Sequence, residues 1–233
     1  MRPPTALPVC LALPRPSAYK GGGVMGRCLF MRKGETHTAP GSRLPSGYTE
    51  LAYIQSSGTQ YINTGFKQNQ NSRVVMHVNP ISITANAWAF EGRNAADKNK
   101  KGVFFYYSSG SLWNADYYDG SGRKSFSGIS STADLNIDYD KNTCTINGVS
   151  VNFTAKTFKS DFNITLLACN TGGTVAGHLS AKLYSCQIYD NDVLVRDFVP
   201  CINASGEVGL YDLVGKQFYG NAGTGVFTGS EVE

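Results

Sequence analysis

This sequence lacks the patterns that mark many metal, membrane and helical proteins. Its six cysteines form no CxxC pair and have no histidine at a zinc-binding spacing, which argues against a zinc site. No apolar run approaches the roughly 18 residues that a membrane-spanning helix needs. No segment of about ten residues repeats its apolar positions with the 3.6-residue period of a helix. We therefore expect little helix and no membrane span.

Signatures of common enzyme classes are also missing. The chain has no GxSxG elbow, no P-loop and no GxGxxG after a strand. Glycoside hydrolases need two carboxylates that flank the scissile bond. The best candidate row alternates along one strand and contains an asparagine and no glutamate: Asp134, Asn136, Asp138 and Asp140. Apolar residues between these positions indicate an ordinary solvent-facing strand, so we predict that the protein is not an enzyme.

Charge is scarce and unevenly placed. Charged residues make up 16% of the chain, and the formal net charge is +4. Residues 1–47 contain seven basic residues and one acidic residue, a net of +6, so the rest of the chain carries a net charge of −2. A slightly acidic folded part is a poor electrostatic match for nucleic acid, and we expect no nucleic-acid partner.

What the chain does contain is glycine, aromatic residues and turn signals. It has 26 glycines and 12% aromatic residues in 233 positions, which suits many short strands joined by tight turns. Residues 1–43 are rich in Pro, Gly and Arg and read as an arm that is flexible or held by a partner. Residues 44–233 read as one sandwich of two antiparallel sheets.

Strand and turn positions follow from alternation and breaker residues. The expected strands are 53–56, 60–66, 73–78, 87–93, 103–107, 111–118, 124–126, 135–139, 143–146, 162–168, 184–189 and 193–199. We expect tight turns at 140–142, 147–148, 190–192 and 215–216, and a loop at 171–177. Pro200 should end the last of these strands, because proline cannot donate to a ladder.

Alternation also assigns side chains to faces. It puts Tyr184 with Cys186 and Ile188, and Trp88 with Phe90. Cysteines within strand-like sequence behave as small hydrophobes, so we expect buried thiols. The alternative is a disulfide between Cys186 and Cys201, which would need an oxidising compartment.

Two blocks of the sequence carry a family resemblance. LPSGYTELAYIQSSGTQYINTGFKQNQNSRVVM at 44–76, and LYSCQIYDNDVLVRDFVPC followed by GEVGLYDLVGKQFYGNAGTG, bracket residues 44–229. They resemble concanavalin A-like (LamG-type) domains of tail and other structural proteins of phages and prophages of gut bacteria, and of some bacterial surface proteins. The resemblance implies an all-β, two-sheet antiparallel jelly-roll sandwich with an irregular N-terminal arm. It implies a virion location, on a phage tail or capsid surface, or alternatively the bacterial cell surface.

A run of aromatic residues is the candidate binding region. FFYYSSGSLWNADYY at 104–118 holds seven aromatic residues in fifteen positions, more than alternating strands can bury on one face. Aromatic rings beside Asn and Asp acceptors are typical of carbohydrate sites. The predicted glycan-binding residues are Trp113, Tyr117, Tyr118 and Asn114, with Trp88 and Arg93 as additions. The alternative is that Phe104, Tyr106 and Leu112 fill a broad core.

Calcium is the one cofactor that the pattern allows. Many LamG-like domains hold one ion with loop carboxylates, and Asp97, Asp116 and Asp119 could supply them here. The alternative is that these residues serve turn chemistry alone, with no cofactor.

These observations lead to one hypothesis and two alternatives. The leading hypothesis is a non-enzymatic phage or prophage virion-associated module that recognises host-surface carbohydrate. Its N-terminal arm would attach to other virion subunits, and the family analogy allows a homo-oligomer. The first alternative is a purely structural decoration or assembly protein that contacts other capsid or tail subunits. The second is a glycan-cleaving depolymerase that uses Asp134 or Asp138.

Overall fold

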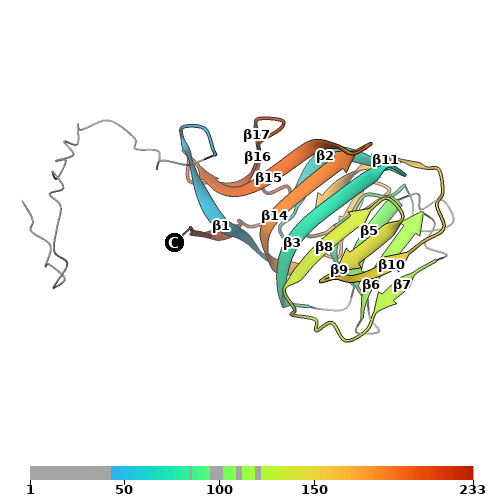
Figure 1. Ribbon diagram of the computed structural model, residues 1–233. Coiled ribbons are helices and arrows are strands. Elements are labelled where there is room, and N and C mark those ends of the chain that lie inside the picture. Colours follow the sequence, from blue (N-terminus) through green and yellow to red (C-terminus); the bar gives the residue numbers. More distant parts are fainter. Residues whose placement is uncertain (1–42, 84–85, 95–101, 109–111, 119–121, 233) are drawn as a thin grey trace, which may run out of the picture. The chain divides into compact units, whose positions relative to one another are not determined.

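The computed structural model describes residues 43–83, 86–94, 102–108, 112–118 and 122–232. These residues form β-strands joined by turns and loops, and they contain no helix (Figure 1). No helix that could span a membrane was found in this part of the chain. The strands are β1 (Tyr48–Ser57), β2 (Ile62–Asn69), β3 (Ser72–Ser82), β4 (Ala87–Glu91), β5 (Gly102–Tyr107), β6 (Trp113–Tyr118), β7 (Lys124–Phe126), β8 (Leu135–Asp140), β9 (Thr143–Ile146), β10 (Val149–Asn152), β11 (Lys159–Leu166), β12 (Cys169–Thr171), β13 (Thr174–Ala176), β14 (Ser180–Asp190), β15 (Val193–Asn203), β16 (Val208–Asp212), β17 (Gln217–Tyr219) and β18 (Thr228–Glu231).

Two sheets make up the sandwich. The ten-stranded sheet has the order β10-β9-β8-β3-β14-β1-β15-β16-β17, with β18 beside β1. The six-stranded sheet has the order β2-β11-β4-β5-β6-β7, and β12 and β13 form a separate hairpin. The paired strands run antiparallel, which confirms the predicted all-β, two-sheet antiparallel sandwich. The predicted domain boundary at residue 43 stays a prediction, because residues 1–42 lie outside the described ranges.

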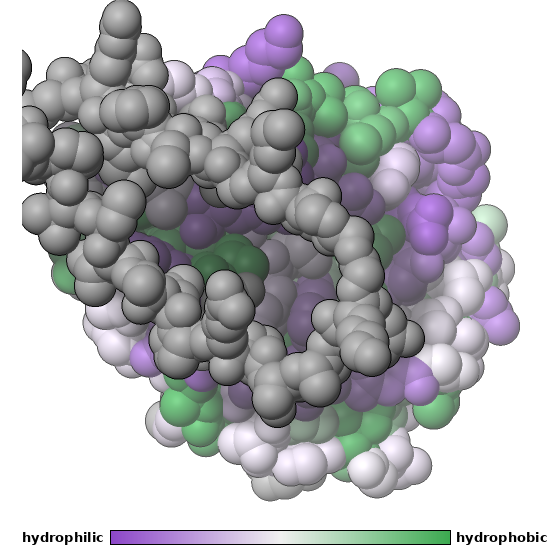
Figure 2. All heavy atoms as spheres, turned by 60° about the vertical axis from the view of Figure 1, so that its left-hand side comes forward, coloured by the Kyte–Doolittle hydropathy of each residue, from purple (hydrophilic) through white to green (hydrophobic). Residues whose placement is uncertain are grey.

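The core lies between the inward faces of the two sheets. Val74, Met76 and Val78 alternate inward along β3 and are at most 1% exposed. From the six-stranded sheet, Phe105 and Trp113 stack with ring centroids 5.1 Å apart. Each such side chain stabilises the fold by about 1.5–3 kcal/mol on burial. On the molecular surface, by contrast, hydrophobic and hydrophilic residues are interspersed over the coloured part of the face shown in Figure 2.

The predicted tight turns are confirmed where both central residues adopt positive φ. Asn191 and Asp192 join β14 to β15 with φ of 51° and 65°. Asn147 and Gly148 join β9 to β10 with φ of 48° and 85°. Two positive φ angles define the type I′ hairpin turn, which Asn and Gly tolerate. The stretch predicted as a loop at 171–177 instead contains most of the β12–β13 hairpin.

The prediction that Pro200 ends a strand is wrong, because β15 continues to Asn203. On one side Pro200 pairs with Leu210 of β16. On the other side the neighbouring strand changes here, from β14 opposite Phe198 to β1 opposite Cys201. A missing N–H at this junction interrupts no regular ladder on that side, which explains why proline is tolerated.

Two β-bulges overturn the predicted faces. The register shifts between Trp88 and Phe90, so Phe90 is buried in the core and Trp88 lies on the outer face of the six-stranded sheet. A second shift between Leu183 and Ser185 leaves Tyr184 half-buried, whereas Cys186 is fully buried. An extra residue in one strand reverses the side to which its neighbours point.

The cysteines of the described part are free. Cys144, Cys169, Cys186 and Cys201 are buried thiols, as predicted, and the alternative of a Cys186–Cys201 disulfide is wrong. Burial raises the pKa of Cys201 to about 12, with a further contribution from Glu50. Thiolates at these positions are therefore disfavoured, and the thiols act as packing groups.

Candidate functional site

The outer face of the six-stranded sheet carries a row of charge and aromatic surface. Glu91 on β4 pairs with Phe104 on β5, and Phe104 pairs with Asp116 on β6. Residues opposite one another in antiparallel strands share a face. The row therefore places one carboxylate on each side of the Phe104 ring.

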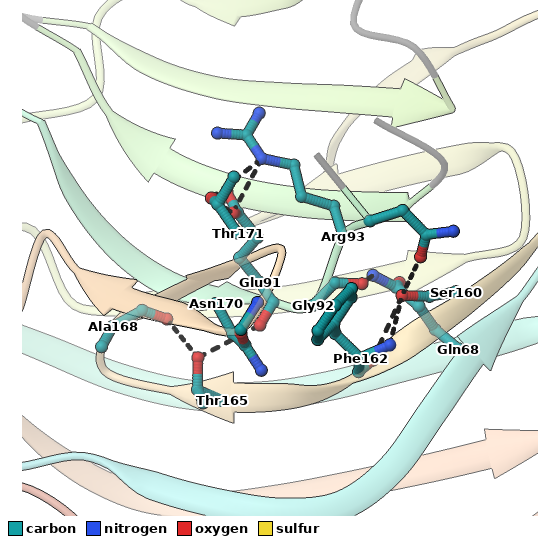
Figure 3. A network of polar contacts seen from close by, with 12 residues as sticks. Gln68, Glu91, Gly92, Arg93, Ser160, Phe162, Thr165, Ala168, Asn170 and Thr171 are labelled. Carbon is teal, nitrogen blue, oxygen red and sulfur yellow. Dashed lines mark hydrogen bonds and ion pairs between the residues drawn. The ribbon is translucent and has the colours of Figure 1, made fainter. Parts of the chain in front are cut away.

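Both carboxylates are fully buried, and each is paired with an arginine. Glu91 Oε1 lies 2.9 Å from Arg93 Nε, and Asp116 Oδ2 lies 3.3 Å from Arg123 Nε. Burial raises the pKa of Glu91, although Arg93 and the hydroxyl of Thr171, which donates to Oε1 at 2.5 Å, act in the opposite direction. Figure 3 shows Arg93 above Glu91 with its Nε directed at this carboxylate and at Thr171.

The two guanidinium groups lie over aromatic rings of β5. Arg93 Cζ is 4.7 Å from the centroid of the Phe104 ring, and Arg123 Cζ is 5.3 Å from that of Tyr106. Such contacts attract a guanidinium cation to the ring face. Phe104 and Tyr106 are almost fully buried as a result.

Hydrogen bonds hold the end of β4 in place (Figure 3). Arg93 forms an isolated parallel bridge with Thr171. Gln68 Nε2 donates to the carbonyl of Gly92 at 2.6 Å, and the hydroxyl of Thr165 contacts the carbonyl of Glu91 at 3.1 Å. Arg93 is therefore oriented by its backbone as well as by its side chain.

Trp88 lies on the same face, but most of its ring is covered. The indole stacks on Tyr106 with centroids 5.2 Å apart, and a Cβ on Gly177 would overlap the ring. Trp88 Nε1 makes no hydrogen bond of good geometry with another described residue, yet it lies near enough to Glu91 to favour the charged carboxylate. Trp88, one of the predicted glycan-binding residues, is thus half-buried between Tyr106 and Gly177, and its ring has no open face for stacking against a sugar.

A pocket of about 360 Å³ lies beside the end of β6. It is lined by Tyr117, Tyr118, Gly122, Lys124, Asn152, Phe153, Thr154 and Lys156. Tyr118 has a φ of 62°, in the left-handed region that bulky residues rarely adopt. Both Tyr117 and Tyr118 consequently contact Phe158, although alternation alone would point them to opposite faces.

Tyr117 shapes this pocket from within. Its hydroxyl donates to the carbonyl of Lys156 at 3.0 Å and accepts the N–H of the same residue at 3.2 Å. Tyr117 is 4% exposed, so it forms the floor of the pocket, and its hydroxyl positions Lys156. Lys124, Asn152 and Thr154 are exposed at the rim, so ammonium, amide and hydroxyl groups surround an aromatic wall.

Trp113 and Asn114 are not available to a ligand, and their predicted roles are wrong. Trp113 is 0% exposed and donates its indole N–H to the carbonyl of Ser130 at 3.1 Å. Asn114 is 1% exposed, donates to the carbonyl of Leu112 and accepts the hydroxyl of Ser125. The register of β5 and β6 explains these positions. Trp113 faces the core, whereas Phe104 and Tyr106, which the alternative interpretation placed in the core, face the outer side of the sheet.

The predicted calcium site stays a prediction. Asp97 and Asp119 lie outside the described residues, and Asp116 is paired with Arg123. Among the residues that the structure does describe, no group of three or more His, Cys, Asp or Glu side chains could hold a metal ion.

The carboxylates of the depolymerase alternative lie on the outer face of the ten-stranded sheet. Asp134 pairs with His77 at 2.9 Å and Asp138 with Arg73 at 2.6 Å, and their side chains are 54% and 38% exposed. The interpretation of this row as a solvated face holds for Asp134 and Asn136, whereas Asp138 and Asp140 are half-buried.

Sequence reasoning missed Glu91, Arg123 and the two pocket lysines. Glu91 had one available signal, because it is a single charge within the otherwise apolar strand AWAFE. Arg123, Lys124 and Lys156 had none, since isolated basic residues near turns are common on protein surfaces.

Comparisons with known proteins add little to this site. A scan against protein-family models and a search of curated protein sequences found no match. Among solved structures, the chain is similar to one described as Ruminococcus gnavus IT-sialidase CBM40, with 17% sequence identity and a TM-score of 0.42. The similarity covers 66% of this chain and 94% of that one. At this level it defines no ligand and no activity for this chain, which its own strands define as an all-β antiparallel sandwich protein.

Proposed function

We propose that this chain is a non-enzymatic carbohydrate-binding module whose ligand enters the pocket beside Tyr118. The observation that carries the proposal is the composition of that pocket: an aromatic wall with a rim of hydrogen-bonding groups. Its volume of about 360 Å³ is near the small end of the usual range for ligand pockets, roughly 300–1,000 Å³.

The lining suits a saccharide in two ways. The ring of Tyr118 offers apolar surface to sugar C–H groups, as aromatic residues do in other amphipathic contacts. Asn152 and Thr154 can donate to and accept from hydroxyl groups, and Lys124 and Lys156 donate. The left-handed backbone at Tyr118 supports the same proposal, because strained residues gather at ligand sites.

Binding is favoured over cleavage by the placement of the carboxylates. None of the described residues that line the pocket is acidic. A glycoside hydrolase would need two carboxylates there, one on each side of the bond.

The setting of the module rests on the sequence resemblance to phage and prophage domains. In this part of the proposal, the sandwich is displayed on a phage tail or capsid and recognises host-surface glycan. Residues 1–43 then attach it to other virion subunits. Display on a bacterial cell surface is the alternative location.

A glycan array followed by calorimetry tests the proposal. The full chain should bind at least one bacterial polysaccharide, and Tyr118→Ala should weaken that binding about ten-fold, equivalent to about 1.4 kcal/mol. Tyr53→Ala is the matched control, since Tyr53 is a half-buried tyrosine on β1, in the ten-stranded sheet. The same affinity should be retained in this variant.

Two results would contradict the proposal. A folded protein that binds no polysaccharide would favour the alternative of a structural virion subunit. Glycan binding that is equally strong in Tyr118→Ala would show that the ligand does not bind in this pocket. If Tyr118→Ala fails to fold, Lys124→Ala replaces it as the test of the pocket, because Lys124 lines the pocket at an exposed position. Unchanged binding in that variant would likewise contradict the proposal.

A further inference from the structure

Two arginines on the outer face of the six-stranded sheet are held in the same way. Each binds a fully buried carboxylate through Nε, Arg93 to Glu91 and Arg123 to Asp116. Each also lies over an aromatic ring, at 4.7 and 5.3 Å from the ring centroids. A carboxylate and a ring together fix the plane of a guanidinium, so little entropy is lost when that group binds a ligand.

The two guanidinium groups belong to one patch. The rings beneath them, Phe104 and Tyr106, occupy alternate positions of β5 with centroids 5.9 Å apart. Both arginines use Nε for their contacts within the described residues, and Figure 3 shows the terminal nitrogens of Arg93 pointing away from Glu91 and Thr171. The terminal nitrogens of Arg93 and the half-exposed side chain of Arg123 therefore belong to the same face of the sheet.

Arg73, on the ten-stranded sheet, is an arginine whose guanidinium donors are bound within the protein. It too lies over a ring, that of Tyr189, and it too has a carboxylate partner, Asp138. Both Nε and Nη2 donate to that carboxylate, at 2.8 and 2.6 Å. Both donors of the Arg73 fork are bound to one carboxylate, whereas the contacts of Arg93 and Arg123 with other described residues use Nε.

The arrangement selects an anion with more than one oxygen. Planar guanidinium forks bind carboxylate and sulfate through pairs of charge-assisted hydrogen bonds. The carboxylates that anchor the arginines are 0% exposed, whereas Arg93 and Arg123 are 12% and 52% exposed. A ligand that approaches this face thus meets hydrogen-bond donors before it meets acceptors.

We propose that Arg93 and Arg123 form a second binding site, which holds the oxyanion of an acidic saccharide. The acidic group is a carboxylate, as in a uronic acid, or a sulfate ester, and both offer the forks two or more oxygens. The site is distinct from the pocket beside Tyr118, although Arg123 lies between two residues that line that pocket, Gly122 and Lys124.

Calorimetry on the full chain with matched probes tests the ligand class. The probes are tetragalacturonate, its carboxyl-reduced neutral counterpart, and a sulfated galactose tetrasaccharide. We expect an acidic probe to bind at least about ten-fold more tightly than the neutral one, because hydrogen bonds to a charged acceptor are stronger than those to a neutral hydroxyl. Preference for tetragalacturonate assigns a carboxylate, and preference for the sulfated probe assigns a sulfate. Equal affinity for the neutral probe would overturn the proposal.

Substitutions by lysine test the forks, because lysine keeps the charge and removes the bidentate geometry. Arg123→Lys, at an exposed position, should weaken binding of the acidic probe about ten-fold, and Arg93→Lys should do the same if its melting temperature shows a folded protein. Arg73→Lys, the matched control, should bind as the wild type does. Unchanged binding in Arg123→Lys would overturn the proposal.

A crossed comparison separates this site from the proposed pocket. Acidic binding that survives Tyr118→Ala but weakens in Arg123→Lys supports the arginine site, even if no neutral saccharide binds and the pocket proposal fails. Acidic binding that is lost in Tyr118→Ala and kept in Arg123→Lys overturns the arginine site and leaves the pocket standing.

Discussion

The two outer faces of the sandwich use the same side chains to different ends. On the ten-stranded sheet, Arg73 and Asp138 are 36% and 38% exposed and bind each other bidentately. On the six-stranded sheet, Glu91 and Asp116 are fully buried and bind their arginines through Nε. The first arrangement is a surface ion pair that is complete in itself. The second leaves hydrogen-bonding capacity directed outward.

The difference shows that burial, and not composition, decides what an arginine can do. An exposed pair contributes about 0–1 kcal/mol, so the fold depends little on it. A buried carboxylate that loses its cation leaves an uncompensated charge in a low dielectric. The six-stranded face therefore depends on its arginines for stability, and their contacts with other described residues use Nε alone.

The largest expected contrast comes from removing one arginine from each face. Arg93→Ala should lower the free energy of unfolding by about 3 kcal/mol, because it strands the buried Glu91. Arg73→Ala should lower it by less than about 1 kcal/mol, because Asp138 is then solvated. Urea unfolding of both variants measures the difference, and equal losses would break the contrast between the faces.

A smaller effect is expected where backbone covers the six-stranded face. Gly177→Ala should cost about 2 kcal/mol, because the new Cβ overlaps Trp88 and the residue has a φ of 57°. Gly128→Ala isolates the cost of positive φ, since Gly128 has a φ of 78° and no atom near its Cβ position. It should cost about 1 kcal/mol in thermal or urea unfolding. Losses of the same size in both variants would mean that Trp88 is not covered as described.

The smallest expected effect is a pH dependence that comes from Glu91. Burial raises its pKa in the folded state, with Arg93 opposing and Asp116 adding to the rise. Between the pKa of the unfolded chain and the raised value, the folded protein holds a proton that the unfolded chain has released. The contribution of Glu91 to stability therefore falls as pH rises through this window.

Comparison with Glu91→Gln isolates this contribution. The difference in free energy of unfolding, wild type minus variant, should decrease as pH increases from about 4, the usual pKa of a glutamate. Melting curves at a series of pH values measure it. A difference that increases with pH would show that the Arg93 pair outweighs burial.

Much of the fold was predictable because its signals are local. Alternating apolar residues predict the strand that contains Val74, Met76 and Val78, and Asn147-Gly148 predicts a hairpin turn from backbone geometry alone. Pro200 was misjudged for the opposite reason. The place where β14 gives way to β1 beside β15 is a property of the assembled sheet.

The candidate site was only partly predictable, since it depends on register. A bulge between Trp88 and Phe90 turns Trp88 outward, and nothing in AWAFE announces that extra residue. The pairing of Glu91, Phe104 and Asp116 across β4, β5 and β6 brings together residues whose spacing in the sequence carries no pattern. Tyr118 was predicted to bind glycan from its aromatic character; the structure shows that it lines the pocket and has a left-handed backbone, which the sequence does not indicate.

Nitrogen-15 spectra of the arginine side chains, recorded on the full chain during a titration with tetragalacturonate, test the central contrast most directly. We predict that the Nε–Hε resonances of Arg93 and Arg123 shift with a common saturation curve while that of Arg73 stays in place. Shifts of equal size at Arg73, or no shift at Arg93 and Arg123 while the probe binds, would contradict the claim that the two outer faces differ in the availability of their arginines.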